Sequence, residues 1–190
     1  RLAEVVSSMA RLGYRSGIGE AESVVRWDPE RLSRKHHYPA LVHPERPTSI
    51  ELHVRPVVFH HRDLLSSEDV LDGARPISLR GADCLLPGPD AMVIHNVVHA
   101  FLFDTRDCMK RISLRQLLEF ALFCQTYLDV VDWDRIEQRF ASRGFRKQLI
   151  EYVVAARVCF GVELTRCSGA FASHRVSPRL GLDLFRLEIE

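Results

Sequence analysis

The segment Ile50–Arg55 carries the side chains of this sequence that are best placed to do chemistry. Successive side chains of a β-strand point to opposite faces, so a strand here would gather Glu51, His53 and Arg55 on one face. A carboxylate on a strand can join other carboxylates around Mg²⁺, a hard ion that prefers oxygen ligands and bridges phosphates. The same alternation is also typical of a solvent-facing sheet, in which Glu51 would pair with Arg55 or with a neighbouring lysine.

Two further pairs of residues have spacings that metal sites use. His95 and His99 are four positions apart, which on a helix puts both imidazoles on one face, as in H-E-x-x-H zinc sites. Asn96 follows His95 and no third ligand is evident, so a helix-surface or interface pair is favoured over zinc. Asp132 and Asp134 stand where a helix should begin, and their role as an N-cap and first-turn acid explains both. We expect four more histidines to be solvated in turns: His36, His37, His60 and His61.

The elements around the central segment predict a mixed α and β structure. Leu2–Leu12 has helical periodicity, and Gly13 stands where such a helix should end. His36–His43 and Ser49–Arg55 are strand candidates joined by a proline-containing turn, which predicts an antiparallel hairpin. Because Pro39 cannot donate to a ladder, the first of these strands should lie at a sheet edge or carry a bulge there.

The second half of the sequence predicts helices. Ser66–Gly73 has the pattern of a short capped helix, and Arg75–Leu86 has alternation for one or two short strands. The run Pro87–Pro89 is a strong break, so we place a domain boundary there, between residues 1–87 and residues 88–190. Helices are then predicted over Ala91–Phe103, Ser113–Tyr127, Trp133–Ser142 and Arg146–Phe160. Two segments are left open: Ser23–Trp27 as a strand, and the tail from Cys167 as a helix or a strand.

The composition is that of an ordinary globular protein. The 190 residues are 46% hydrophobic and 27% charged, which is enough for a sizeable core. The 26 basic and 25 acidic residues nearly cancel, so bulk charge does not indicate nucleic acid or a membrane surface as a partner. No run approaches the roughly 20 apolar residues that cross a bilayer, and we expect a cytoplasmic protein. Five widely spaced cysteines predict reduced, mostly buried thiols.

The order and spacing of several segments resemble the uncharacterised nucleotidyltransferase family of bacteria. The resemblance covers most of the chain and implies an α+β fold, with a mixed or antiparallel sheet of the polymerase β-like nucleotidyltransferase type followed by an all-helical C-terminal part. Residues 1–87 would then be a partial nucleotidyltransferase-like domain. The segments that carry it are Leu12-Gly13-Tyr14, Ile50–Arg55, Asp90–His95 with His99, Ile112–Glu119, and Val131-Asp132-Trp133 through Gly144.

The resemblance also implies a reaction. Such enzymes transfer a nucleoside monophosphate from an NTP to an acceptor, and they use Mg²⁺ held by three carboxylates, of which Glu51 matches the third. His53 and Arg55, on the same strand face, are candidates to bind a phosphate or the acceptor, or else to pair with Glu51. Arg115 is a further candidate for substrate binding, since on its predicted helix it would face the cleft between the two parts or be solvated.

The sequence also departs from the family pattern. A Gly-Ser turn and an Asp-x-Asp motif should precede Leu12-Gly13-Tyr14, and the residues before it contain neither. Val54 replaces a tryptophan and Glu119 an aspartate. We therefore expect this chain, either a fragment truncated at its N-terminal end or a lineage that has lost catalysis, not to perform the transfer as written. The alternative function is a non-catalytic regulatory module whose helical half docks a protein partner.

Overall fold

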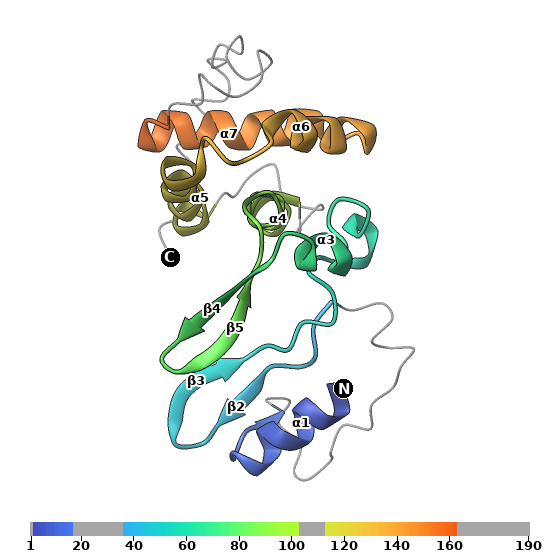
Figure 1. The fold of residues 1–190 in the computed structure, drawn as a ribbon, viewed down its shortest axis with the longest axis vertical. Helices are drawn as coiled ribbons and strands as arrows, with labels where there is room; N and C mark the ends of the chain where they lie inside the picture. Colours follow the sequence, from blue (N-terminus) through green and yellow to red (C-terminus); the bar gives the residue numbers. More distant parts are fainter. Residues whose placement is uncertain (1, 17–35, 103–112, 163–190) are drawn as a thin grey trace. The chain divides into compact units, whose positions relative to one another are not determined.

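The computed structural model describes residues 2–16, 36–102 and 113–162, and these fall into two compact units (Figure 1). Residues 1–62 belong to the N-terminal unit and residues 63–190 to the C-terminal unit. The fold is α+β, with small antiparallel sheets, as predicted, and a helical C-terminal part. The strand predicted over Ser23–Trp27 and the tail from Cys167 lie outside the described residues. The domain boundary predicted after residue 87 stays a prediction.

The N-terminal unit begins with helix α1, Leu2–Arg11, as predicted. The helix ends in a Schellman motif, in which the Tyr14 N–H donates to the Met9 carbonyl and the Gly13 N–H to the Ala10 carbonyl, each at 3.0 Å. Gly13 has a φ of 89°, a backbone conformation that residues with a Cβ rarely adopt. The motif turns the chain into the first strand of the sheet.

That sheet has three antiparallel strands in the order β1-β2-β3, which are Arg15–Ser16, Leu41–His43 and Arg46–Ile50. The predicted hairpin is confirmed as β2 and β3, although its turn is shorter than expected and Arg46 already belongs to a strand. Because β2 pairs with β1 on its other side, β2 is not an edge strand, which leaves the bulge as the predicted alternative for Pro39.

The strand predicted over Ser49–Arg55 is wrong for most of its length, because β3 ends at Ile50. Antiparallel pairing resumes only at a bridge between His37 and His53. Between the Leu41–Ile50 pair and the His37–His53 bridge, the first strand advances by four residues and the second by three, so one segment has an extra residue. This irregularity contains Pro39, which has no N–H for the ladder, and it confirms the predicted bulge.

The C-terminal unit opens with the predicted short capped helix, α3, Ser67–Leu71, and its N-cap Ser66 forms a capping box with Asp69. A hairpin of β4, Arg75–Leu79, and β5, Ala82–Leu86, follows, and it confirms two short strands. Its two-residue turn has positive φ at both positions, as type I′ turns require. Most residues of both strands are exposed.

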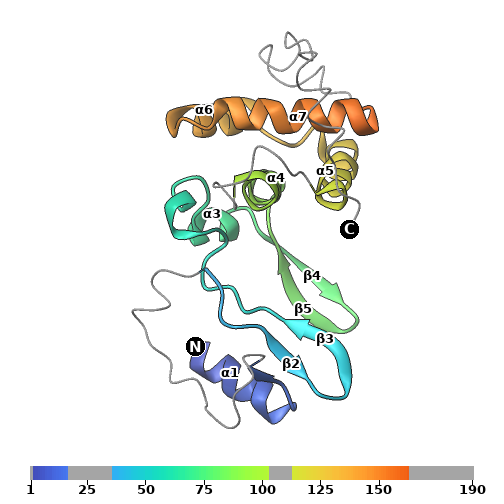
Figure 2. The same ribbon diagram turned by 180° about the vertical axis from the view of Figure 1, so that it is seen from behind.

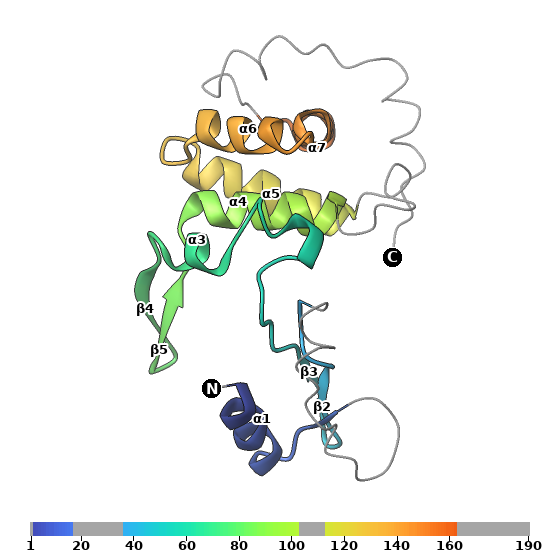
Figure 3. The same ribbon diagram turned by 90° about the vertical axis from the view of Figure 1, so that its right-hand side faces the viewer.

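In the described part of the C-terminal unit, four helices follow the hairpin and confirm the four that the sequence predicts. Helices α6 (Trp133–Ser142) and α7 (Arg146–Phe160) lie over the pair α4 (Pro89–Val97) and α5 (Leu114–Tyr127) (Figures 2 and 3). The first helix departs from its prediction in one respect, since its last turn, η2, is a π-helix rather than an α-helix. The turn η2 comprises Val98–Leu102.

The core of the C-terminal unit receives side chains from all of these helices. Asp132 caps α6 by accepting a hydrogen bond from the Arg135 N–H at 3.0 Å, and Gly144 ends it with a φ of 78°, as predicted. None of the described helices is both long and apolar enough to span a bilayer. The side chains that are essentially inaccessible to solvent include Val93, Val97, Val98, Leu117, Phe120, Ile136, Phe140, Leu149 and Tyr152.

Candidate functional site

Glu51, the carboxylate that the sequence singles out, directly follows the end of β3. Its side chain is 53% exposed, and its Oε2 lies 3.6 Å from Nε2 of His53. Of the partners that the sequence left open for Glu51, the described residues show His53 as the one in contact with its carboxylate. The Arg55 guanidinium lies over the ring of Phe59, 5.5 Å from its centroid. The structure therefore brings together two of the three residues that the strand pattern grouped.

Three histidine rings lie close together, and one of them, His53, is the neighbour of the Glu51 carboxylate. The rings of His36, His37 and His53 have centroids between 4.4 and 5.7 Å apart. The short antiparallel pairing beyond the bulge brings them together, since the Val54 N–H donates to the His36 carbonyl at 2.8 Å. His37 donates from Nδ1 to the Tyr38 carbonyl at 2.9 Å.

The expectation that the turn histidines are solvated is wrong for two of them. His36 is 6% exposed and His61 is 3% exposed. His61 is the last residue of the 3₁₀ turn η1, Phe59–His61. Sequence reasoning missed both because an imidazole has an apolar body that can be buried as readily as it is solvated.

A magnesium site does not follow from the described residues alone. Mg²⁺ demands oxygen ligands in octahedral geometry, whereas the described polar neighbour of Glu51 is the imidazole of His53, a ligand that suits zinc, copper or nickel better. No group of three or more acidic, histidine or cysteine side chains in residues 2–16, 36–102 and 113–162 is arranged to hold a metal ion. Glu51 can thus supply one oxygen ligand, but it does not form a metal centre by itself.

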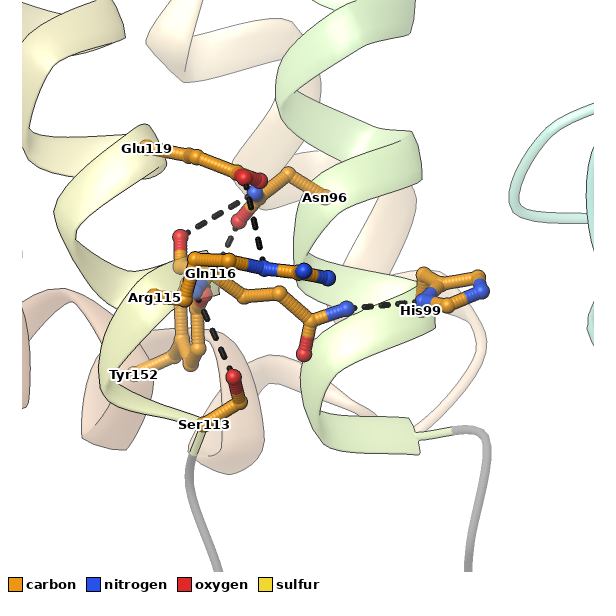
Figure 4. A network of polar contacts seen from close by, with 7 residues as sticks. All are labelled: Asn96, His99, Ser113, Arg115, Gln116, Glu119 and Tyr152. Atoms are coloured by element: carbon orange, nitrogen blue, oxygen red, sulfur yellow. Dashed lines mark hydrogen bonds and ion pairs between the residues drawn. The ribbon is translucent and has the colours of Figure 1, made fainter. Parts of the chain in front are cut away.

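A second polar region lies in the C-terminal unit, where α4, α5 and α7 meet (Figure 4). The buried hydroxyl of Tyr152 donates to Oδ1 of Asn96 at 2.9 Å, and Nδ2 of Asn96 donates to the Gln116 carbonyl at 3.2 Å. Burial raises the pKa of Tyr152 well above its usual range, and the negative charges of Glu119 and Cys124 raise it further. The tyrosine is therefore a neutral hydrogen-bond donor at every physiological pH.

This network reaches the surface through His99. Nε2 of Gln116 donates to Nδ1 of His99 at 2.8 Å, so the imidazole keeps its own proton on Nε2 when it is neutral (Figure 4). The rings of His95 and His99 are stacked with centroids 5.6 Å apart, which agrees with a surface pair. His99 lies in the π-helical turn η2, and such turns are rare and frequent at functional sites.

Arg115 lies on α5 at the edge of the same network. Its side chain is 82% exposed, and its Nε is 3.7 Å from Oε1 of Glu119 one turn later (Figure 4). Solvent screens a pair of this kind, so it holds the guanidinium only loosely. Arg115 and Glu51 belong to different units, and the structure gives no placement of one relative to the other.

The sequence pattern did not single out three residues of the network, Asn96, Gln116 and Tyr152. Their only signal is a polar group inside an apolar helical stripe, which for Asn96 was visible between Ile94 and Val97. Such a residue is costly to bury without partners, so it predicts a buried hydrogen bond. The identity of the partners depends on how three helices pack, and a single sequence does not contain that information.

The chain belongs to the uncharacterised nucleotidyltransferase family, whose family model matches residues 1–161. No curated protein and no solved structure matches it.

Proposed function

We propose that this chain binds the metal–nucleotide complex used in nucleotidyl transfer, the reaction in which a nucleoside monophosphate passes from an NTP to an acceptor. Membership of the family supports the class of reaction. The observation that carries the choice of site is the exposed carboxylate of Glu51, which follows β3 and has a single imidazole as its described polar partner. An exposed carboxylate is free to take up a ligand without first breaking a buried interaction.

Mg²⁺ would reach this site as a complex with the nucleotide. Protein-bound Mg²⁺ commonly keeps several waters and takes its remaining ligands from one or two carboxylates and from substrate phosphates. A single carboxylate at Glu51 is compatible with that mode of binding and incompatible with tight binding of the free ion. The ion would neutralise phosphate charge that develops during transfer.

Three further residues, His53, Arg55 and Arg115, have supporting roles in this proposal. His53 lies 3.6 Å from the Glu51 carboxylate and would position it, more strongly when the imidazole is protonated. Arg55 and Arg115 are cations that could bind phosphate oxygens of the nucleotide or of the acceptor. Arg115 is the more accessible candidate because most of its side chain is exposed.

An activity assay tests the proposal. The full-length gene product would be incubated with radiolabelled NTPs and Mg²⁺, and transfer and hydrolysis would be followed with and without a chelator. The proposal predicts activity that the chelator abolishes and that falls at least about a hundredfold in Glu51→Gln, because loss of a catalytic metal ligand removes several kcal/mol of transition-state stabilisation. Full activity of Glu51→Gln would remove the role assigned to Glu51. A folded protein that neither binds nor turns over any NTP would favour the regulatory module instead.

A further inference from the structure

A cavity of about 270 Å³ lies within the C-terminal unit, between α3, the start of α4 and α6. The backbone closes tightly on one side of it, because a Cβ on Gly88 would lie only 3.3 Å from the Gly73 carbonyl oxygen. The volume is just below the range of about 300 to 1,000 Å³ that small-molecule pockets occupy, so a ligand here must be small. The charged side chains that line the cavity are Asp69, Asp72, Asp90, Arg135 and Arg139.

Polar contacts hold the two ends of this cavity together. At one end, the Arg139 guanidinium donates to Oδ1 of Asp69 at 2.9 Å and to the Leu64 carbonyl at 3.2 Å. At the other end, the Asp132 N–H donates to Oδ1 of Asp90 at 3.0 Å, which ties the start of α6 to the start of α4. These contacts fix the three walls of the cavity relative to one another. They also pair the charges of Asp69 and Arg139 with each other.

Two of the lining charges, Asp72 and Arg135, have no such role, and both belong to exposed residues at the open side of the cavity. Within the described part of the chain, the structure gives neither the Asp72 carboxylate nor the Arg135 guanidinium a hydrogen bond or an ion pair. Arg135 and Arg139 are four residues apart on α6 and so share one face of that helix. The second carboxylate oxygen of Asp90 is likewise not used by the contact with Asp132. The cavity thus presents negative and positive groups that are available together.

The remaining walls are apolar and include the buried side chains of Leu65, Ile94 and Ile136. A simple anion would meet the carboxylates of Asp72 and Asp90, and a simple amine would meet the guanidinium of Arg135, so each would be repelled by part of the lining. A ligand that carries both charges satisfies all of these groups. We propose that this cavity binds a small zwitterion, an apolar α-amino acid, with its ammonium toward Asp72 and Asp90 and its carboxylate toward Arg135.

Titration of the chain with three matched probes tests this site. L-leucine carries both charges, isopentylamine only the positive charge, and 4-methylpentanoate only the negative charge, on closely similar apolar groups. If the cavity binds a zwitterion, L-leucine should bind saturably at millimolar concentration. Calorimetry or NMR shifts of the α6 amides would detect this binding. Each single-charge probe should bind at least about tenfold more weakly, because a charged hydrogen bond is lost. Absence of L-leucine binding, or equal binding of the three probes, would overturn the proposal.

Matched variants place the binding at this cavity. Asp72→Asn and Arg135→Gln should each weaken L-leucine binding at least about tenfold. Asp134→Asn, on an exposed side chain of α6, and Lys147→Gln, on an exposed side chain of α7, change charge in the same way and should leave the affinity unchanged. Unchanged circular dichroism shows that each variant is folded. Equal affinity in Asp72→Asn, Arg135→Gln and the control variants would contradict the assignment, whatever the outcome of the nucleotidyl-transfer assay.

Discussion

Glu51 and Tyr152 are the polar centres of the two units, and the protein holds them in opposite ways. The Glu51 carboxylate is more than half exposed and has one described polar partner, at 3.6 Å. Tyr152 is completely buried, and its hydroxyl donates to Asn96 at 2.9 Å within a chain of hydrogen bonds that joins three helices. A buried polar group contributes to stability only if it is paired, whereas an exposed one is available to a ligand.

This difference separates stability from recognition. Mutations around Tyr152 should lower the free energy of unfolding, because they leave cavities or unpaired groups in a close-packed interior. Mutations at Glu51 should hardly affect unfolding, because exposed substitutions usually change stability by less than about 0.5 kcal/mol. The predictions that follow measure how far this separation holds.

The largest effect is expected at Tyr152. Its ring packs edge-on against Phe120, with ring centroids 5.2 Å apart, and Tyr152→Ala should lower the free energy of unfolding by about 3–5 kcal/mol. Tyr152→Phe keeps the ring and removes the donor to Asn96, so it should cost about 1–3 kcal/mol. Urea denaturation measures both values. Equal stability of wild type and Tyr152→Phe would show that the hydroxyl has no net role.

A backbone position gives the largest effect in the N-terminal unit. Gly13→Ala forces a residue with a Cβ into a φ of 89° and brings that Cβ to 2.8 Å from Nε2 of His43. We expect a loss of about 1–2 kcal/mol, measured by hydrogen exchange of the β2 and β3 amides. Gly81→Ala is the matched control, since it has a similar φ but nothing within 4 Å of its Cβ. If Gly13→Ala lowers the free energy of unfolding no more than Gly81→Ala does, the contact between the new Cβ and His43 has no energetic cost.

A smaller, pH-dependent effect is expected at Asp69. Desolvation alone would raise the pKa of this carboxyl, but hydrogen bonds from Arg139 and from Ser66 outweigh it and hold the pKa below its usual value. A carboxyl with a lowered folded-state pKa stabilises the protein above its unfolded pKa of about 3.9, and that stability is lost as the pH falls through the folded value.

Asp69→Asn should therefore cost about 1 kcal/mol at neutral pH and should unfold with a weaker dependence on acid. Denaturation curves at a series of pH values give this comparison. Asp63→Asn is the control, because its carboxylate pairs with Arg143 at the surface, where half of each side chain is exposed. An acid dependence of unfolding that is the same in Asp69→Asn and wild type would contradict this role.

The fold could be predicted from the sequence where local rules decide the structure. Helix α6, for example, begins at a residue capped by Asp132 and ends before Gly144, as its sequence indicates. The strand predicted over Ser49–Arg55 fails for a reason that is also local but lies on the opposite strand. Alternation over residues 50–55 would form a strand only beside a continuous partner, and Pro39 interrupts that partner. Alternation reports which face is buried, and it does not report whether a partner strand continues.

The candidate site was less predictable than the fold. Glu51 could be chosen from its residue type and position, and His53 as its neighbour on the strand, but its pairing with His53 rather than Arg55 depends on where regular pairing stops. The buried partners Asn96 and Tyr152 are 56 residues apart in the chain, so only the packing of α4 against α7 brings them together. The role of Glu51 toward a nucleotide and Mg²⁺ stays a prediction.

The smallest change in stability is expected at Arg115. Because its side chain is exposed and its pair with Glu119 is screened, Arg115→Gln should alter the free energy of unfolding by less than about 0.5 kcal/mol. If the guanidinium binds a phosphate, the same variant should raise the KM for the NTP and leave kcat nearly unchanged. A large loss of stability would instead make Arg115 part of the structural network around Tyr152.

Titration with Mg·NTP is the most direct test of the central claim that the exposed carboxylate of Glu51 binds a metal–nucleotide complex. The wild-type full-length gene product, Glu51→Gln and Glu45→Gln would be compared by calorimetry, Glu45 being an exposed glutamate in the turn before β3. We predict that Glu51→Gln binds at least about tenfold more weakly than wild type, with unchanged stability, and that Glu45→Gln binds like wild type. Equal affinity of all three proteins for Mg·NTP would contradict the claim.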